Sequence, residues 1–93
     1  MQAIKMHIKR EKKGMSIVAE LLLDLIVGYG KGVSIMDLVE KAYEINVASP
    51  ATSHRALAWL KDNDYINVKF VKDNRTKYLF GTARGCKFVG VVA

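Results

Sequence analysis

A short polar stretch follows the dipeptide Ser49-Pro50 near the middle of the chain. It holds four polar side chains in a row, namely Thr52, Ser53, His54 and Arg55. Ser49 is a good N-cap, and Pro50 suits the first helical position because its missing N–H has no partner there. The polar residues would then lie in the first two turns of a helix. Short donors and acceptors at that place can reach base edges, and Ser49 with its free backbone N–H groups can hold a phosphate.

A second polar group lies between two apolar runs in the C-terminal half. Ile66, Val68 and Phe70 alternate with polar residues, and the second run follows at 78–80. Two such runs around a turn-forming centre predict a β-hairpin. The tip would carry three polar side chains: Asn74, Arg75 and Lys77. They are candidate contacts to a polyanion, or else ordinary solubilising charges.

Serines that can cap helices occur twice before the polar stretch at 49–55 and once at its start. Ser16, Ser34 and Ser49 are the expected N-caps of helices over 16–29, 34–44 and 49–63. Spacings of three and four predict the buried faces. For the first helix these are Ile17, Val18, Leu21, Leu22, Leu25 and Ile26; for the second, Ile35, Leu38, Val39, Ala42 and Tyr43; for the third, Ala56, Leu57 and Leu60. Residues 32–34 are expected to be an extended link, and 85–93 either a strand or a short helix.

The order of these elements predicts an α+β fold, a winged helix-turn-helix with three helices and a β-hairpin wing. Two helices joined by a short turn, the second polar at its start, are typical of the helix-turn-helix. We expect the third helix to enter the major groove of double-stranded DNA, with the hairpin on the backbone or in the minor groove. Arg55 would contact a guanine or a phosphate, or alternatively pair with Asp37 or Glu40 of the preceding helix.

The two polar groups also resemble the motifs of MarR-type winged-helix transcription regulators. The stretch from Ser49 to Ile66 is similar to the family's recognition helix, and the sequence Asp73-Asn-Arg-Thr-Lys77 to its Asp-Arg-Arg wing. Thr82-Ala-Arg-Gly85 follows at the family's separation. The chain departs from the family pattern at His54, Asp64, Asn74 and Gly81. The resemblance implies that Thr52, Arg55 and Arg75 contact DNA.

Charge is distributed unevenly along the 93 residues, whose formal net charge is +6. Residues 1–13 carry +4 and residues 55–93 carry +5, whereas residues 14–54 carry −3. This segregation favours a polyanionic partner. We divide the chain into a basic N-terminal arm, 1–14, and a domain, 15–93. One cysteine, no membrane-spanning stretch and no secretory signal indicate a reducing, cytoplasmic setting.

No constellation in the sequence predicts catalysis. His7 and His54 have no partner set for a metal or a nucleophile, and no Gly-rich phosphate loop is present. We therefore expect a DNA-binding protein that is not an enzyme, with no cofactor, no metal and no small-molecule substrate. Transcription regulation is the expected use, with a protein-interaction module or a plasmid or phage replication-maintenance factor as alternatives. A homodimer through the first helix and the apolar tail would match paired half-sites.

Overall fold

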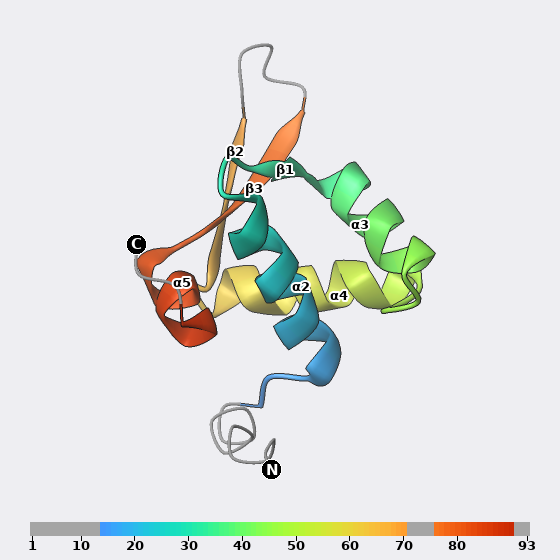
Figure 1. Ribbon diagram of the computed structural model, residues 1–93, viewed down its shortest axis with the longest axis horizontal. Coiled ribbons are helices and arrows are strands. Elements are labelled where there is room, and N and C mark those ends of the chain that lie inside the picture. Colours follow the sequence, from blue (N-terminus) through green and yellow to red (C-terminus); the bar gives the residue numbers. More distant parts are fainter. Residues whose placement is uncertain (1–13, 71–75, 91–93) are drawn as a thin grey trace.

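The computed structural model describes residues 14–70 and 76–90, which form an α+β domain with four helices and a three-stranded antiparallel sheet (Figure 1). In chain order the elements are α2 (Ile17–Tyr29), β1 (Val33–Ser34), α3 (Ile35–Glu44), α4 (Pro50–Asp62), β2 (Ile66–Phe70), β3 (Lys77–Gly81) and α5 (Ala83–Val89). Residues 1–13 of the expected arm and 71–75 of the expected hairpin tip lie outside this part of the chain.

Every described helix begins at a hydroxyl side chain that accepts a backbone N–H three residues on. Ser16, Ser34 and Ser49 cap α2, α3 and α4, as predicted, and Thr82 caps α5. Each cap satisfies one of the N–H groups that a helix start leaves without an internal partner, a contribution of about 1 kcal/mol. These local signals therefore place the helices correctly.

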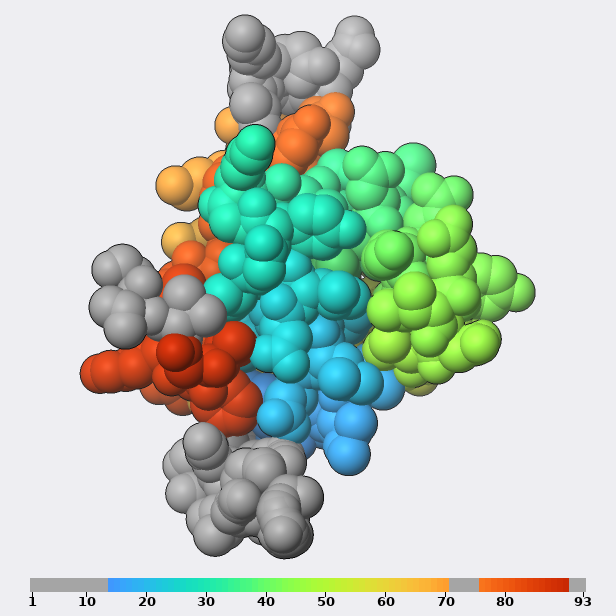
Figure 2. Space-filling view, viewed as in Figure 1, coloured from blue at the N-terminus to red at the C-terminus, as the bar shows by residue number. Residues whose placement is uncertain are grey.

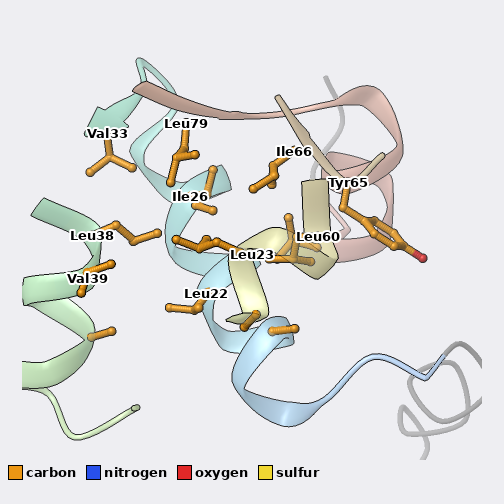
Figure 3. Close-up of a cluster of buried hydrophobic side chains, with 14 of the residues drawn as sticks. Leu22, Leu23, Ile26, Val33, Leu38, Val39, Leu60, Tyr65, Ile66 and Leu79 are labelled. Carbon is orange, nitrogen blue, oxygen red and sulfur yellow. The ribbon is translucent and has the colours of Figure 1, made fainter. Parts of the chain in front are cut away.

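The core forms around α2, which packs against α3, α4, β3 and α5 (Figure 3). Its buried stripe is Ala19, Leu22, Leu23 and Ile26, at spacings of three and four. The prediction was wrong for Ile17 and Leu21, which are 66% and 41% exposed. Because α2 is apolar on nearly every side, its sequence pattern does not define which side faces the core.

The other helices follow their predicted faces more closely. Leu38, Val39 and Ala42 of α3 are buried, but Tyr43 is 63% exposed and so does not belong to the core. In α4 the three apolar residues expected to face inward do so: Ala56, Leu57 and Leu60. Tyr65, just after α4, is buried and stacks on the half-buried Trp59 with ring centroids 5.9 Å apart.

The sheet has the strand order β1-β3-β2. The hairpin is confirmed in its strands, with Val68 opposite Leu79. The segment expected to be a link is itself a strand, since Val33 pairs with Leu79 and Ser34 with Tyr78. Two residues are too few to show the period-two pattern of a strand.

The end of the described chain is helical and adds a fourth helix to the three that were predicted. Thr82 Oγ1 donates to the Asp64 carbonyl oxygen at 2.7 Å, and Arg84 donates to the Tyr65 hydroxyl at 3.1 Å. The guanidinium of Arg84 also lies over the Tyr65 ring, 4.4 Å from its centroid. These contacts fasten α5 to the end of α4. No helix in the described ranges is long and apolar enough to cross a membrane.

Candidate nucleic-acid interface

One side of α4 is free of the core along its whole length. α2 covers the opposite side (Figure 1), and the residues that face away from it are exposed: Ala51, His54, Arg55, Ala58, Lys61 and Asp62. The short connection from α3 bends at Asn46, which has a φ of 60°. The start of α4 is therefore presented at the surface beside the end of α3.

Three predicted site residues form one hydrogen-bonded row on this surface. Ser49 Oγ accepts the Thr52 N–H at 3.3 Å and donates to Thr52 Oγ1 at 3.1 Å. Arg55 Nη2 donates to the same Thr52 oxygen at 3.4 Å. The spacing of three places the side chains on successive turns of one helix face. The alternative ion pair is not formed: within the described ranges Arg55 pairs with neither Asp37 nor Glu40.

Ser53 does not belong to this surface, contrary to the sequence prediction. Its side chain is fully buried, and its Oγ has no hydrogen-bond partner among the described residues. Ser53 lies on the side of α4 that also buries Ala56 and Leu57. A buried hydroxyl cannot touch DNA, so Ser53 is removed from the candidate contacts. The sequence did carry a signal for this, since Ser53 precedes the inward-facing Ala56 and Leu57 by three and four residues.

His54 is exposed and lies beside a groove between α4 and the hairpin. The groove has a volume of about 210 Å³. His54, Lys61 and Lys77 contribute polar heads to its lining, and Leu57, Ile66 and Leu79 contribute apolar side chains. Lys61 is a site residue that the sequence analysis missed. Its position seven residues after His54, on the same helix face, is the signal that would have found it.

Lys77 marks the end of β3 nearest the expected tip. It pairs with Phe70 across the hairpin, and its Nζ lies 5.8 Å from the centroid of the Phe70 ring. On the other face of the hairpin, Lys69 Nζ lies 5.3 Å from the Phe80 centroid. Exposed cations thus flank both faces of the hairpin. Asn74 and Arg75, the other tip residues, lie outside the described ranges.

The described residues carry little of the positive charge. They hold eight basic and seven acidic side chains, so their net charge is +1. Of the remaining +5, residues 1–13 carry +4 and residues 71–75 carry +1. A polyanion would therefore find most of the positive charge in residues 1–13 and 71–75.

The described side chains offer no metal site. No group of three His, Cys, Asp or Glu in this part of the chain is arranged to hold a metal ion. Cys86, the single cysteine, is half-buried in α5. Partial burial raises the pKa of the Asp24 carboxyl, but this group is on α2, away from the α4 row.

Comparisons with known proteins find no match. No protein-family model fits the chain, and no curated protein or solved structure is significantly similar to it. The likeness to MarR-type regulators therefore rests on the two sequence motifs described above. The interpretation of the site depends on the geometry of α4 and the hairpin.

Proposed function

We propose that this domain is a winged helix-turn-helix that binds double-stranded DNA and regulates transcription. The observation that carries the proposal is the hydrogen-bonded row Ser49, Thr52 and Arg55 at the start of α4, in which Ser49 and Arg55 are exposed and Thr52 is half-buried, with the opposite side of the helix in the core. A helix in the major groove needs this arrangement, because its first turns must touch bases while its other side holds the protein body.

The proposal assigns each of these side chains either to a DNA phosphate or to a base edge. Ser49 and the first backbone N–H groups of α4 hold a phosphate, and Thr52, His54 and Arg55 meet base edges. Lys61, Lys69 and Lys77 hold phosphates, with Asn74 and Arg75 at the hairpin tip. The basic arm adds further phosphate contacts. Phosphate contacts set the affinity and position, and the α4 contacts set the sequence preference.

Binding to a labelled random-sequence duplex, followed by fluorescence anisotropy over a range of salt, tests the proposal. The affinity should fall by about 0.9 decades per decade of salt for each phosphate neutralised. On a duplex selected from a random pool, Arg55→Ala should weaken binding by about tenfold or more, the value of one lost charge-assisted hydrogen bond. Lys87→Ala on α5 is the matched control, because it removes an exposed cation far along the chain from α4 and should change little.

Absence of binding to any duplex at low salt would end the proposal. Equal losses in Arg55→Ala and Lys87→Ala would mean that only overall charge attracts DNA and that α4 does not read it. Selection of bound sequences from a random duplex pool would then show no preferred site.

A homodimer belongs to the same proposal. The exposed apolar residues of α2, Ile17 and Leu21, offer a surface for a second copy, and two copies would bind half-sites one helical turn apart. Of the apolar tail, Phe88 and Val89 are half-buried and pack against the core, and residues 91–93 lie outside the described ranges. Light scattering should give twice the mass of one chain, and Ile17→Glu should halve it.

A further inference from the structure

A second and larger groove lies between α3 and the start of α4, closed at one end by β3. Its volume is about 690 Å³, within the range of grooves that hold small ligands or peptide segments. Apolar side chains dominate its lining: Ile35, Met36, Val39, Tyr43 and Pro50. The proposed DNA contacts use only the His54 and Lys77 rim of this groove, so most of its lining has no partner.

Two large apolar side chains on the α3 side of this groove are unusually exposed. Met36 is 75% exposed and Tyr43 is 63% exposed, although they lie seven residues apart on one face of the helix. α3 lies at the edge of the molecule (Figure 2, green), and both side chains leave most of their surface uncovered by the described chain. Apolar surface of this kind, next to polar groups, marks an interaction site.

The α3 wall of the groove also carries negative charge. Asp37 and Glu40 line it from α3, whereas His54 faces it from α4 and Lys77 from β3. The Lys77 ammonium lies over the Phe70 ring at 5.8 Å from the centroid. Two carboxylates on the α3 wall repel a DNA phosphate and attract a cation. The α3 wall therefore fits an apolar segment with basic side chains.

Residues 1–13 of this chain have that chemistry. They contain five basic residues and one acidic residue, and their apolar residues Ile4, Met6 and Ile8 alternate with polar or basic neighbours. Thirteen residues can extend over at most about 43–47 Å. The apolar residues Ile4 to Ile8 lie six to ten residues before Gly14 and can therefore extend about 20–36 Å from it, in a molecule that measures 45 × 28 × 20 Å.

We propose that the basic arm docks in the α3–α4 groove of its own chain, with apolar residues against Met36 and Tyr43 and cations beside Asp37 and Glu40. The docking itself is independent of DNA. Its consequence rests on the proposed function: phosphates compete with Asp37 and Glu40 for the same cations, so duplex DNA should displace the arm from the groove.

A spin label on the arm of the full-length chain tests the docking without DNA. Ala3→Cys carries the label in a Cys86→Ser background, and the amide signals of the isotopically labelled protein report its position. Signals from Met36 to Tyr43 should weaken several-fold at low salt and recover in Glu40→Lys and at high salt. Asp62→Lys, with the same charge change at the end of α4, is the matched control and should leave the weakening in place. Met36→Ser should reduce it through the apolar contact.

Three results would overturn the docking. The first is that the spin label leaves the α3 signals unchanged. The second is that Glu40→Lys and Asp62→Lys restore the signals equally. The third is that the weakening also appears when spin-labelled chains are mixed with separate, isotopically labelled chains, since the contact is then between molecules. Loss of duplex binding with intact docking would instead overturn only the proposed function.

Discussion

Ser49 and Thr52 are joined by two hydrogen bonds, because Ser49 Oγ accepts the backbone N–H of Thr52 and donates to Thr52 Oγ1. Arg55 donates to the same Thr52 oxygen. Since that oxygen accepts two bonds, its own hydroxyl hydrogen stays free to donate. Thr52 is thus oriented as a donor, which suits the acceptors O6 and N7 of guanine or O4 of thymine in the major groove.

Thr52→Val should weaken binding to a duplex selected from a random pool by about tenfold, since one base contact is worth about 1–3 kcal/mol. Binding to random-sequence duplex should change much less, because valine keeps the shape and removes only the hydroxyl. Fluorescence anisotropy with both duplexes measures the difference. Thr52→Ser, which keeps the hydroxyl, is the control and should retain the preference. Equal loss on both duplexes would assign Thr52 to the backbone and not to a base.

The buried hydroxyl of Ser53 leads to a prediction about stability. Its Oγ is fully buried without a hydrogen-bond partner in the described chain, a condition that costs about 1–3 kcal/mol. Ser53→Ala removes the unpaired group and adds helix propensity, so the melting temperature should rise and duplex binding should stay the same. Thermal unfolding followed by circular dichroism measures the first effect.

The matched variant for Ser53→Ala is Ala56→Ser, which places a new hydroxyl on the same buried side of α4. It should lower the melting temperature. If Ser53→Ala is the less stable protein, the Ser53 hydroxyl has a partner that stabilises the fold.

The cases of Ser53 and Ser49 show what could be predicted from the sequence. Helix starts are set by local hydrogen bonds, so Ser16, Ser34 and Ser49 identified three helices correctly. Ser53 could also have been assigned to the buried side of α4, because Ala56 and Leu57 follow it at spacings of three and four. Its polar side chain and its place near the helix start led to the opposite prediction.

Contacts between elements limit what the sequence can predict for α2 and for the sheet. The helix is apolar on nearly every side, so its buried stripe is chosen by its neighbours and the exposure of Ile17 could not be predicted. Strand β1 exists because Val33 and Ser34 meet β3, a contact distant in sequence. Lys61 could have been predicted from the sequence, since its spacing of seven residues from His54 places it on the same exposed face of α4.

Gly85 is predicted to be indispensable for the packing of α5. A Cβ at this position would collide with the backbone carbonyl oxygen of Tyr65 and would lie 3.2 Å from a methyl group of Leu23. Backbone cannot move aside as a flexible side chain can, so Gly85→Ala should lower the free energy of unfolding by about 1–3 kcal/mol, typical of overpacking. Urea unfolding measures it.

Gly28 in α2 provides the opposite control. A Cβ there would meet nothing within 4 Å. Gly28→Ala should therefore stabilise the protein by about 0.5–1 kcal/mol, the difference in helix propensity between the two residues. Similar changes in both variants would show that α5 does not pack against Tyr65 as described.

The raised pKa of Asp24 leads us to expect that the free energy of unfolding depends on pH. Partial burial on α2 raises the pKa of this carboxyl above its ordinary value, because burial disfavours the charged form. The folded state then holds the proton more tightly than the unfolded state. The contribution of Asp24 to stability is therefore complete at pH below the unfolded pKa, about 3.9, and is lost as the pH rises through the folded value.

Asp24→Asn removes this titration and leaves a neutral side chain of similar shape. The free energy of unfolding of the wild type, relative to that of Asp24→Asn, should be highest near pH 3 and should fall as the pH is raised to about 6. Urea unfolding of both proteins at a series of pH values gives this difference directly, since the titrations that both chains share cancel. A difference that rises with pH would mean that a nearby cation or donor stabilises the charged carboxylate in the folded state, and that burial is the weaker effect at this position.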